Sequence, residues 1–274
     1  MKKVFISVDI EGMEGVVSGL QTNRKHSDFN VARKRLAKDV NAAIEACLDF
    51  GVEEIIVCDA HADMENLLIE DLHPQAELIS GAIRSSLQME NFDESFDGLI
   101  VFGHSGAGMS YGGVIDHTWN GGKIYNIRLN GQVFNTEALL NAVVAGHYNV
   151  PLIAIIGDTA VCNEVEQVIE NVSTVVVKKG LSRFSAQSIH PTKARELIYA
   201  GVKKGLESSK DIKPLNLGKE ITMEIDYKDS NMAETADLIP CVERIAPRTV
   251  KVTAEAETLF KLQELMVFRL VDRY

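Results

Sequence analysis

The sequence predicts an α/β fold, in which a mostly parallel sheet is flanked by helices and followed by a small α+β C-terminal subdomain. Continuous apolar runs rich in β-branched residues are typical of strands that are buried on both faces. Helical patterns lie between several of these runs, and alternating strands and helices form parallel sheets. The expected strands are Val4–Val8, Ile55–Cys58, Leu99–Phe102, Leu152–Ile156 and Thr174–Val177.

Helices are expected between these strands. The longest covers Asn30–Phe50 and ends before Gly51, a residue type that commonly follows a helix. Its apolar residues recur at helical spacing at positions Val31, Leu36, Val40, Ile44 and Leu48. Two shorter helices are expected over Glu137–His147 and Asn163–Asn171, and another runs from Thr192 to about residue 207.

A polar segment over Lys210–Lys219, with Pro214 and Gly218, suits a linker. We therefore expect a main α/β domain over residues 1–210, which carries the candidate site described below, and a small α+β subdomain over 211–274. The elements expected in the subdomain are the strand Ile221–Tyr227, the helix Met232–Ile239, the strand Thr249–Ala254 and the helix Glu257–Val271. The apolar face of the last helix packs either on the main domain or against another subunit.

Composition excludes several classes of protein. The 274 residues are 46% hydrophobic, which suits a packed core. Against 39 Asp+Glu there are 28 Lys+Arg, and the net charge of −11 argues against nucleic acid or an anionic membrane as the main partner. No apolar run approaches the about 18 residues of a membrane span. Asp9 and Glu11 interrupt the first apolar stretch too early for a signal peptide, so we expect a cytoplasmic location.

The four cysteines are scattered at Cys47, Cys58, Cys162 and Cys241, without a CxxC pair. This spacing suits neither a zinc knuckle nor a disulfide framework. Cys47 and Cys58 lie within apolar patterns and are expected to be small buried hydrophobes.

Carboxylates and imidazoles follow three of the expected strands. Asp9 and Glu11 follow the first strand, His61 the second, and His104 the third. The carboxyl ends of parallel strands meet at one edge of a sheet, where ligands bind. Oxygen and nitrogen ligands of this kind suit a divalent transition metal, with zinc first, and a carboxylate such as Asp9 can bridge two ions.

Each of these positions also has a purely structural interpretation. Asp9 can cap the next element, Glu11 can be a solvated turn residue, and a single histidine after a strand is commonly a hydrogen-bonded structural residue. Their coincidence at three strand ends favours a metal site. The glycine-rich run over 103–108 lacks the GKS/T ending of a phosphate loop, and it can equally let a loop bend closely over a metal centre. His117, taken alone, is typical of a surface loop.

Longer motifs give a more specific indication. They are SVDIEG, CDAHADMENLL with LHPQAELISG behind it, GHSGAG, GVIDHTW, TEALLNAVVAGHYNVPLIAIIGD and VKKGLSRFSAQSIHP. Together they resemble the M55 family of metallopeptidases, which are D-aminopeptidases, and the similarity spans most of the chain.

The resemblance implies a site with two zinc ions per subunit. Matched position by position, the implied ligands are Asp9, Glu11, His61, His104 and Glu137, with Asp9 as the bridge. The family's catalytic histidine falls on His117. From the pattern alone, Glu137 only compensates the dipole at the start of a helix.

The implied function is that of a zinc-dependent aminopeptidase, which releases N-terminal amino acids from short peptides by metal-activated water. D-amino acids such as D-Ala are the favoured class. The role of His117 stays open between acid/base, oxyanion stabiliser and nucleophile. The resemblance also implies a ring-like homo-oligomer, with a decamer as the expected form.

Two alternatives belong to other classes. One is a di-metal hydrolase of another amide or of a phosphoester, although the motifs lack the clustered Arg and Lys that phosphate favours. The other is a catalytically silent protein that captures peptides. The presence of His117 beside all five ligand positions argues against it.

Overall fold

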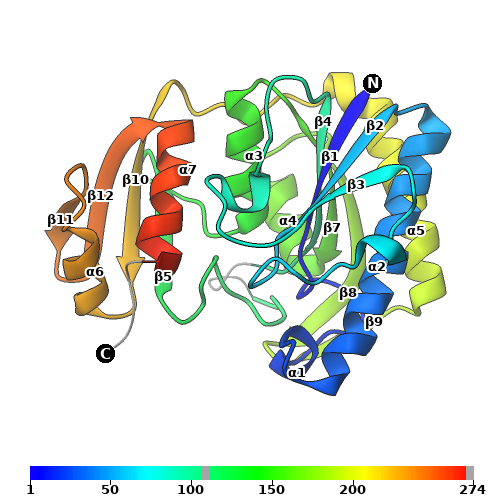
Figure 1. The fold of residues 1–274 in the computed structure, drawn as a ribbon, viewed down its shortest axis with the longest axis horizontal. Coiled ribbons are helices and arrows are strands. Elements are labelled where there is room, and N and C mark those ends of the chain that lie inside the picture. The colour runs from blue at the N-terminus through cyan, green and yellow to red at the C-terminus, as the bar shows by residue number, and fades with distance from the viewer. Residues whose placement is uncertain (107–110, 270–274) are drawn as a thin grey trace.

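The computed structural model describes residues 1–106 and 111–269, which form two sheets and their flanking helices (Figure 1). The larger sheet is parallel except for its last pair, β8 with β9. Its strands lie in the spatial order β3 (Ala76–Ile79), β2 (Glu54–Asp59), β1 (Lys3–Val8), β4 (Gly98–His104), β7 (Leu152–Asp158), β8 (Ser173–Ser182) and β9 (Ser185–Ser188). The predicted parallel sheet and its five apolar strands are confirmed.

The smaller sheet is antiparallel throughout. Its strands lie in the order β11 (Glu243–Ala246), β12 (Thr249–Glu255), β10 (Glu220–Tyr227), β5 (Ile124–Leu129) and β6 (Gln132–Val133). Side chains of β10 alternate between buried and half-exposed after Glu220, because the apolar Ile221, Met223 and Ile225 alternate with polar residues. Because β5 and β6 precede residue 210, the sheet takes strands from both sides of the expected domain boundary. The division at that residue stays a prediction.

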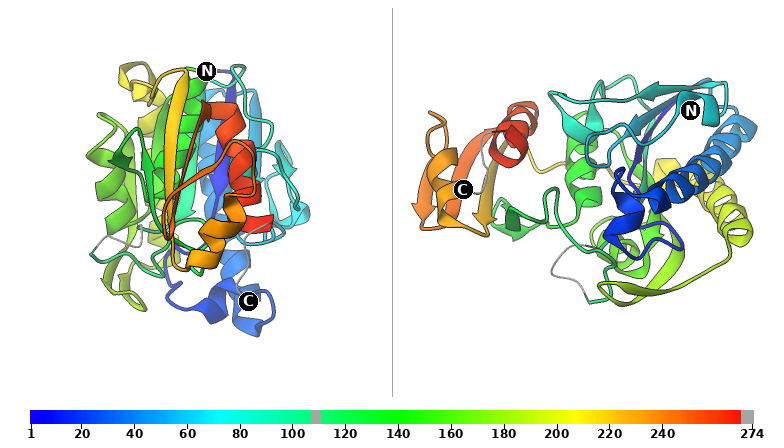
Figure 2. Two further views of the ribbon diagram at one scale, coloured as in Figure 1. Left: turned by 90° about the vertical axis from the view of Figure 1, so that its left-hand side faces the viewer. Right: turned by 60° about the horizontal axis from the view of Figure 1, so that its bottom comes forward.

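Helices cover both faces of the larger sheet. Figure 1 shows α2 and α5 side by side on one face, and α3 and α4 on the other face, toward the smaller sheet. The bounds are α1 (Gly19–Thr22), α2 (Ser27–Phe50), α3 (Glu137–His147), α4 (Thr159–Glu166), α5 (Pro191–Ser208), α6 (Ser230–Ala236) and α7 (Ala256–Gln263). The right-hand view of Figure 2 places the smaller sheet at one end of the molecule and the pair α2 and α5 at the other.

Short turns complete the described chain. Three 3-10 turns are η1 (Ile69–Asp71), η2 (Leu87–Met89) and η3 (Ser209–Asp211), and a π turn, η4 (Glu264–Arg269), continues α7. Gly51 ends α2 with φ 93° and donates its backbone N–H to Cys47 and Leu48, so the predicted stop of that helix is confirmed.

Helix α3 is buried around almost its whole circumference because it lies between the two sheets. Its residues from Glu137 to Gly146 are all buried, which matches a sequence that is apolar on every side. The predicted bounds of this helix are those observed. Its N-terminus therefore points a carboxylate, Glu137, into the interior.

Several helices depart from the predicted bounds. Helix α2 begins at Ser27 rather than Asn30, and α6 covers Ser230–Ala236 rather than Met232–Ile239. Helix α4 begins at Thr159 rather than Asn163, because the Asp158 carboxylate accepts the backbone N–H of Val161 at 2.9 Å and caps the helix early. The final helix was expected to reach Val271, which lies outside the described residues. In the described part Leu259 and Met266 are buried within the molecule and Leu265 is 38% exposed, so most of the apolar face packs internally.

Cys47, Cys58 and Cys162 are buried and unpaired, which confirms the expectation for the first two, while Cys241 is exposed. None of the helices in the described residues is long and apolar enough to cross a membrane.

Strand β1 lies between β2 and β4, so the order of the strands reverses beside it. In open α/β sheets such a reversal opens a crevice at the carboxyl ends of the strands.

Candidate metal centre

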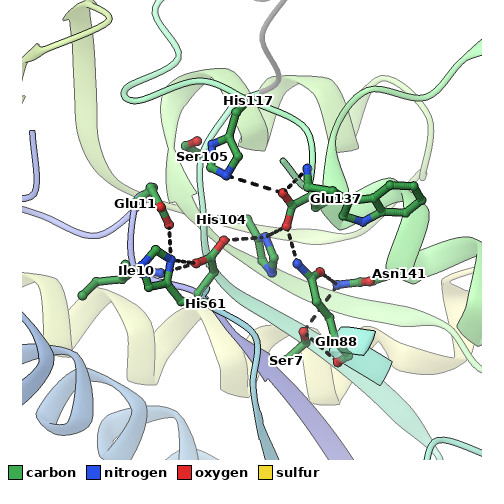
Figure 3. Close-up of polar contacts among 12 residues, drawn as sticks. Ser7, Ile10, Glu11, His61, Gln88, His104, Ser105, His117, Glu137 and Asn141 are labelled. Carbon is green, nitrogen blue, oxygen red and sulfur yellow. Dashed lines mark hydrogen bonds and ion pairs between the residues drawn. The ribbon is translucent and has the colours of Figure 1, made fainter. Parts of the chain in front are cut away.

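The three strand ends and the start of α3 bring five buried acids and histidines together (Figure 3). Their exposed fractions do not exceed 8%. They are Asp9 and Glu11 after β1, His61 after β2, His104 at the end of β4, and Glu137 at the start of α3. All five ligand positions implied by the motifs thus lie in one place.

Asp9 stands between two groups of possible ligands. One group contains Asp9, Glu11 and His61, and the other contains Asp9, His104 and Glu137. Within each group the ligand atoms lie within 4.8 Å of one another. The Asp9 carboxylate turns Oδ1 toward His61 Nδ1 at 3.0 Å and Oδ2 toward His104 Nδ1 at 3.2 Å. One oxygen for each group is the geometry of a bridging carboxylate.

The remaining carboxylates complete the two groups. Glu11 Oε2 lies 3.1 Å from His61 Nδ1, and Glu137 Oε2 lies 3.2 Å from His104 Nδ1. Glu11 Oε2 is buried and accepts no hydrogen bond. A buried charged oxygen without a hydrogen-bond donor is costly, and a cation at this position removes the cost.

The tautomer of His61 also indicates a cation. Its Nε2 lies 2.7 Å from the carbonyl oxygen of Thr22, and a carbonyl can only accept, so Nε2 carries the proton. In the neutral ring Nδ1 then points a lone pair at Asp9 and Glu11. A cation bound beside the two carboxylates would be met by this lone pair, and a carbonyl behind a ligating imidazole is the usual arrangement at metal sites. The donor set therefore fits zinc.

Charge interactions within the cluster shift its titration. Burial raises the pKa of Asp9 to about 6, and the charge of Glu11 acts in the same direction. Burial lowers the pKa of His61, but the facing carboxylates of Glu11 and Asp9 outweigh it and hold that pKa well above its ordinary value. Burial acts to raise the pKa of Glu137, yet hydrogen bonding and charge from His104 bring it down to about 2. The carboxylates thus attract positive charge to the space between them.

Two glycines let the loops after β1 and β4 meet closely. Gly103 has φ +74°, and a Cβ at this position would lie 2.0 Å from the carbonyl oxygen of Asp9. A Cβ on Gly12 would lie 1.9 Å from the carbonyl oxygen of His104. The Gly12 N–H donates to Gly103 O at 2.6 Å. Close backbone approach therefore places the two ligand-bearing loops side by side.

The glycine-rich run after β4 is only partly described, since Ala107 and Gly108 lie outside the described residues. Gly106 N–H donates to the buried Asp158 carboxylate at 3.1 Å, and Val114 N–H donates to the same carboxylate at 2.9 Å. Asp158 therefore holds both described sides of the loop that leads to His117.

His117 lies at the edge of the cluster, with 19% of its side chain exposed. Its Nδ1 lies 2.8 Å from the carbonyl oxygen of Ile115 and therefore donates to it. Nε2 is left facing Glu137 Oε1 at 3.7 Å. Burial lowers the pKa of His117, but the nearby carboxylates of Glu11 and Glu137 raise it overall. The side chain presents a proton-accepting nitrogen to the cluster.

A cavity of about 340 Å³ opens beside these groups. His117 and Glu137 line it together with apolar side chains that include Leu87, Trp119 and Phe268. Phe268 comes from η4, next to the smaller sheet, so both layers of the molecule contribute to the cavity. Its volume lies at the small end of the range of about 300–1,000 Å³ for ligand pockets.

Several residues at the site gave no interpretable sequence signal. Lys178 is buried in the middle of β8, where its Nζ donates to the carbonyl oxygens of Glu11 and Val16, the latter at 2.7 Å. Burial lowers the pKa of Lys178 to about 8. A lysine within an apolar strand is a detectable anomaly, but its partners are distant in sequence. Asp59 holds the loop after β2 by accepting the backbone N–H groups of Asn66 and Leu67.

The family model Peptidase_M55, described as D-aminopeptidase, matches residues 1–266. The chain belongs to the M55 peptidase family. Membership confirms the resemblance that the motifs indicate, and it makes the chain a metallopeptidase, a hydrolase.

This M55 peptidase is similar to a relative in sequence and to a solved structure. A D-aminopeptidase of Bacillus subtilis (strain 168) is 31% identical over 268 residues, which cover 97% of this chain and 95% of the relative. A solved structure, the Zn-dependent D-aminopeptidase DppA from Bacillus subtilis, a self-compartmentalizing protease, matches with a TM-score of 0.92. The identity there is 30%, and the match covers 96% of both chains. The α/β fold of this M55 chain is therefore that of the zinc-dependent relative.

Proposed function

We propose that this chain is a zinc-dependent aminopeptidase that releases N-terminal residues, D-amino acids in particular, from short peptides. The observation that carries the proposal is the pair of buried ligand groups that share Asp9, in a chain of the M55 family. The D-aminopeptidase relatives support the same substrate class.

The proposed site holds two zinc ions per subunit. Asp9, Glu11 and His61 would hold one ion, and Asp9, His104 and Glu137 the other. Ions bound there would polarise the scissile carbonyl and lower the pKa of a water molecule. The buried, unpaired oxygen of Glu11 and the tautomer of His61 support this assignment. Metal analysis of the purified protein tests it, with two zinc ions per chain as the expected result.

His117 is the proposed catalytic residue. Because Nδ1 donates to the carbonyl of Ile115, the free Nε2 can take up a proton beside Glu137 and return it to the leaving amine. The cavity walls formed by Leu87 and Trp119 exclude water from part of this space. Its small volume suits the end of a short peptide.

A panel of L- and D-aminoacyl dipeptides, assayed with and without a chelator, tests the function. We expect cleavage of D-aminoacyl dipeptides that the chelator abolishes and that added zinc restores. A generic phosphoester serves as the control, because among the described residues that line the cavity there is no lysine or arginine to hold a phosphate. Phosphoester hydrolysis without peptide cleavage would contradict the proposal, and so would peptide binding without metal-dependent cleavage.

We propose in addition a homo-oligomer, ring-like and decameric, in the cytoplasm. The self-compartmentalizing relative supports assembly, and the four free cysteines support a reducing compartment. Light scattering on the purified protein measures the subunit number, and a monomeric mass would contradict the assembly.

A further inference from the structure

The amide of Gln88 is held at both ends beneath the metal centre (Figure 3). Gln88 lies in η2, between β3 and β4, and is 6% exposed. Its Nε2 donates to Glu137 Oε2, and its Oε1 accepts from Asn141 Nδ2 at 2.8 Å. Asn141 lies one helical turn after Glu137 on α3. The amide therefore bridges a proposed ligand to the body of the same helix.

A buried network fixes the direction of these hydrogen bonds. The Ser7 hydroxyl donates to the backbone carbonyl of Gln88 at 3.2 Å, and its oxygen lies 3.4 Å from Asn141 Nδ2. Ser7, Gln88 and Asn141 are all buried. With the Gln88 amide reversed, its oxygen would face the Glu137 carboxylate and its NH₂ would face the NH₂ of Asn141. A single orientation satisfies every group, and half-satisfied buried networks are unstable.

The network determines where Glu137 can point. Gln88 Nε2 holds Oε2 of the carboxylate, and the backbone N–H of Trp119 holds Oε1 at 2.6 Å. With both oxygens held, the carboxylate cannot rotate freely. Oε2 stays beside His104, and Oε1 stays on the side of His117.

We infer that Gln88 is a positioning residue that orients the Glu137 carboxylate for the cation shared by Asp9, His104 and Glu137. The inference rests on the proposed two-zinc site. Glu137 is the proposed ligand to which the Gln88 side chain donates. In the group of Asp9, Glu11 and His61, other residues do the holding: Thr22 O holds the His61 ring, and Lys178 holds the Glu11 carbonyl. Loss of the Gln88 amide should therefore weaken the binding of one of the two ions and not of the other. Partners of metal ligands contribute about 10–100-fold to metal affinity.

The test is a zinc titration of metal-free protein against a chromophoric chelator. The Gln88→Leu substitution keeps the approximate size of the side chain and removes both amide contacts. We expect one of two zinc affinities to fall by about 10–100-fold and the other to stay unchanged. The Co²⁺ absorption spectrum of the loaded variant should change as well, because it reports ligand geometry at the ion.

Gln263→Leu is the matched control. Gln263 is also a buried glutamine, 1% exposed, but it contacts Met223 beneath the smaller sheet. This variant should lose stability without any change in zinc affinity or in the cobalt spectrum. Equal losses in the two variants would show a general effect of removing a buried amide and would overturn the inference.

A double-mutant cycle with Asn141 separates positioning from folding. Asn141→Ala should lower the affinity for the same zinc ion. Adding it to Gln88→Leu should produce little further loss of zinc affinity, because Asn141 acts on Glu137 through Gln88. Additive losses, or unchanged zinc affinity in Gln88→Leu, would overturn the inference. If the wild-type protein binds a single zinc ion, the two-ion proposal fails, whereas the effect of Gln88 on that ion is still measured.

Discussion

Backbone carbonyls determine which imidazole nitrogen is available at the metal centre. Thr22 O accepts the Nε2–H of His61, and Ile115 O accepts the Nδ1–H of His117. The two histidines are thus opposite tautomers. His61 presents Nδ1 to the carboxylates, while His117 presents Nε2 to the edge of the cavity. This difference separates a ligand from a residue that can transfer a proton.

At the residue scale, His117→Ala should keep zinc and lose turnover. The Glu137 carboxylate, which faces His117, is held by Gln88 and by the backbone N–H of Trp119 and not by His117. Acid/base groups contribute about 10²–10⁴-fold to rate. Zinc content and kcat on a D-aminoacyl dipeptide check this together. His73→Ala, in a loop before β3, serves as the control and should retain full activity. Unchanged turnover in His117→Ala would refute the assigned role.

At the scale of elements, the approach of the loop after β1 to the end of β4 is decided by a glycine with positive φ. Gly103→Ala adds a Cβ that collides with the backbone of Asp9, and backbone atoms cannot move aside as a flexible side chain can. We expect the variant to lose zinc affinity and more than about 1 kcal/mol of stability. Zinc titration and urea unfolding measure the two effects.

Gly131→Ala controls for conformational strain alone. Gly131 has φ +79°, close to that of Gly103, but a Cβ there meets nothing within 4 Å. The control should lose some stability and keep its zinc affinity. Equal zinc affinities in the two variants would contradict the role of the close approach.

The contact between α2 and α5 contains a buried acid, Asp39, that couples stability to pH. Burial raises the pKa of Asp39 to about 8, and the neighbouring Glu14 acts in the same direction. Arg195, at 3.2 Å from Asp39, opposes the shift, and Arg35 donates to the Glu14 carbonyl. Between about pH 4 and 8 the folded state keeps a proton that the unfolded state releases. The free energy of unfolding therefore falls as pH rises through this window.

Asp39→Asn should flatten that dependence. The amide still accepts a hydrogen bond from Arg195 but does not titrate, so up to about 1.4 kcal/mol per pH unit disappears from the slope. Urea unfolding at several pH values between 4 and 8 measures the difference between variant and wild type, in which the contribution of the metal centre cancels. Asp28→Asn, an exposed change on the same helix, is the control. Parallel curves for Asp39→Asn and wild type would refute the prediction.

At the scale of the whole molecule, the cavity lies where the two sheets and their helices meet. Phe268 from η4 and Trp119 from the loop before β5 line it beside the metal centre. The strand ends of the larger sheet and the start of α3 therefore supply the proposed ligands, and the C-terminal segment supplies part of the wall. The size of the N-terminal residue that can be cleaved is therefore expected to depend on Phe268 and Trp119 rather than on the proposed ligands.

Phe268→Ala should widen the range of N-terminal residues that are cleaved. Removing the ring enlarges the cavity, so kcat/KM for a bulky residue should rise relative to that for alanine by about tenfold or more. Leu265→Ala, on the same turn but not lining the cavity, should leave the ratio unchanged. An unchanged ratio in Phe268→Ala, with zinc content intact, would show that another wall sets the size limit.

Sequence patterns by themselves determined the parallel sheet, because Val4–Val8 and the other buried runs are apolar on both faces. They also placed Asp9, His61 and His104 at one edge, since the ends of neighbouring parallel strands must coincide. Glu137 came only from the family resemblance. A glutamate in a first helical turn has an ordinary electrostatic explanation, and only packing between two sheets turns it inward.

Tertiary structure alone decided the partners that the ligands meet. The sequence separation is 49 residues between Gln88 and Glu137, 39 between Thr22 and His61, and 167 between Lys178 and Glu11. The segments of Gln88, Thr22 and Lys178 carry no periodicity that indicates these contacts. The second sheet likewise combines β5 with β10, nearly one hundred positions later, as the register of Arg128 with Glu224 shows. Periodicity reports which side of an element faces the core. It does not indicate which distant residue packs against that side, because this depends on the path of the whole chain through the fold.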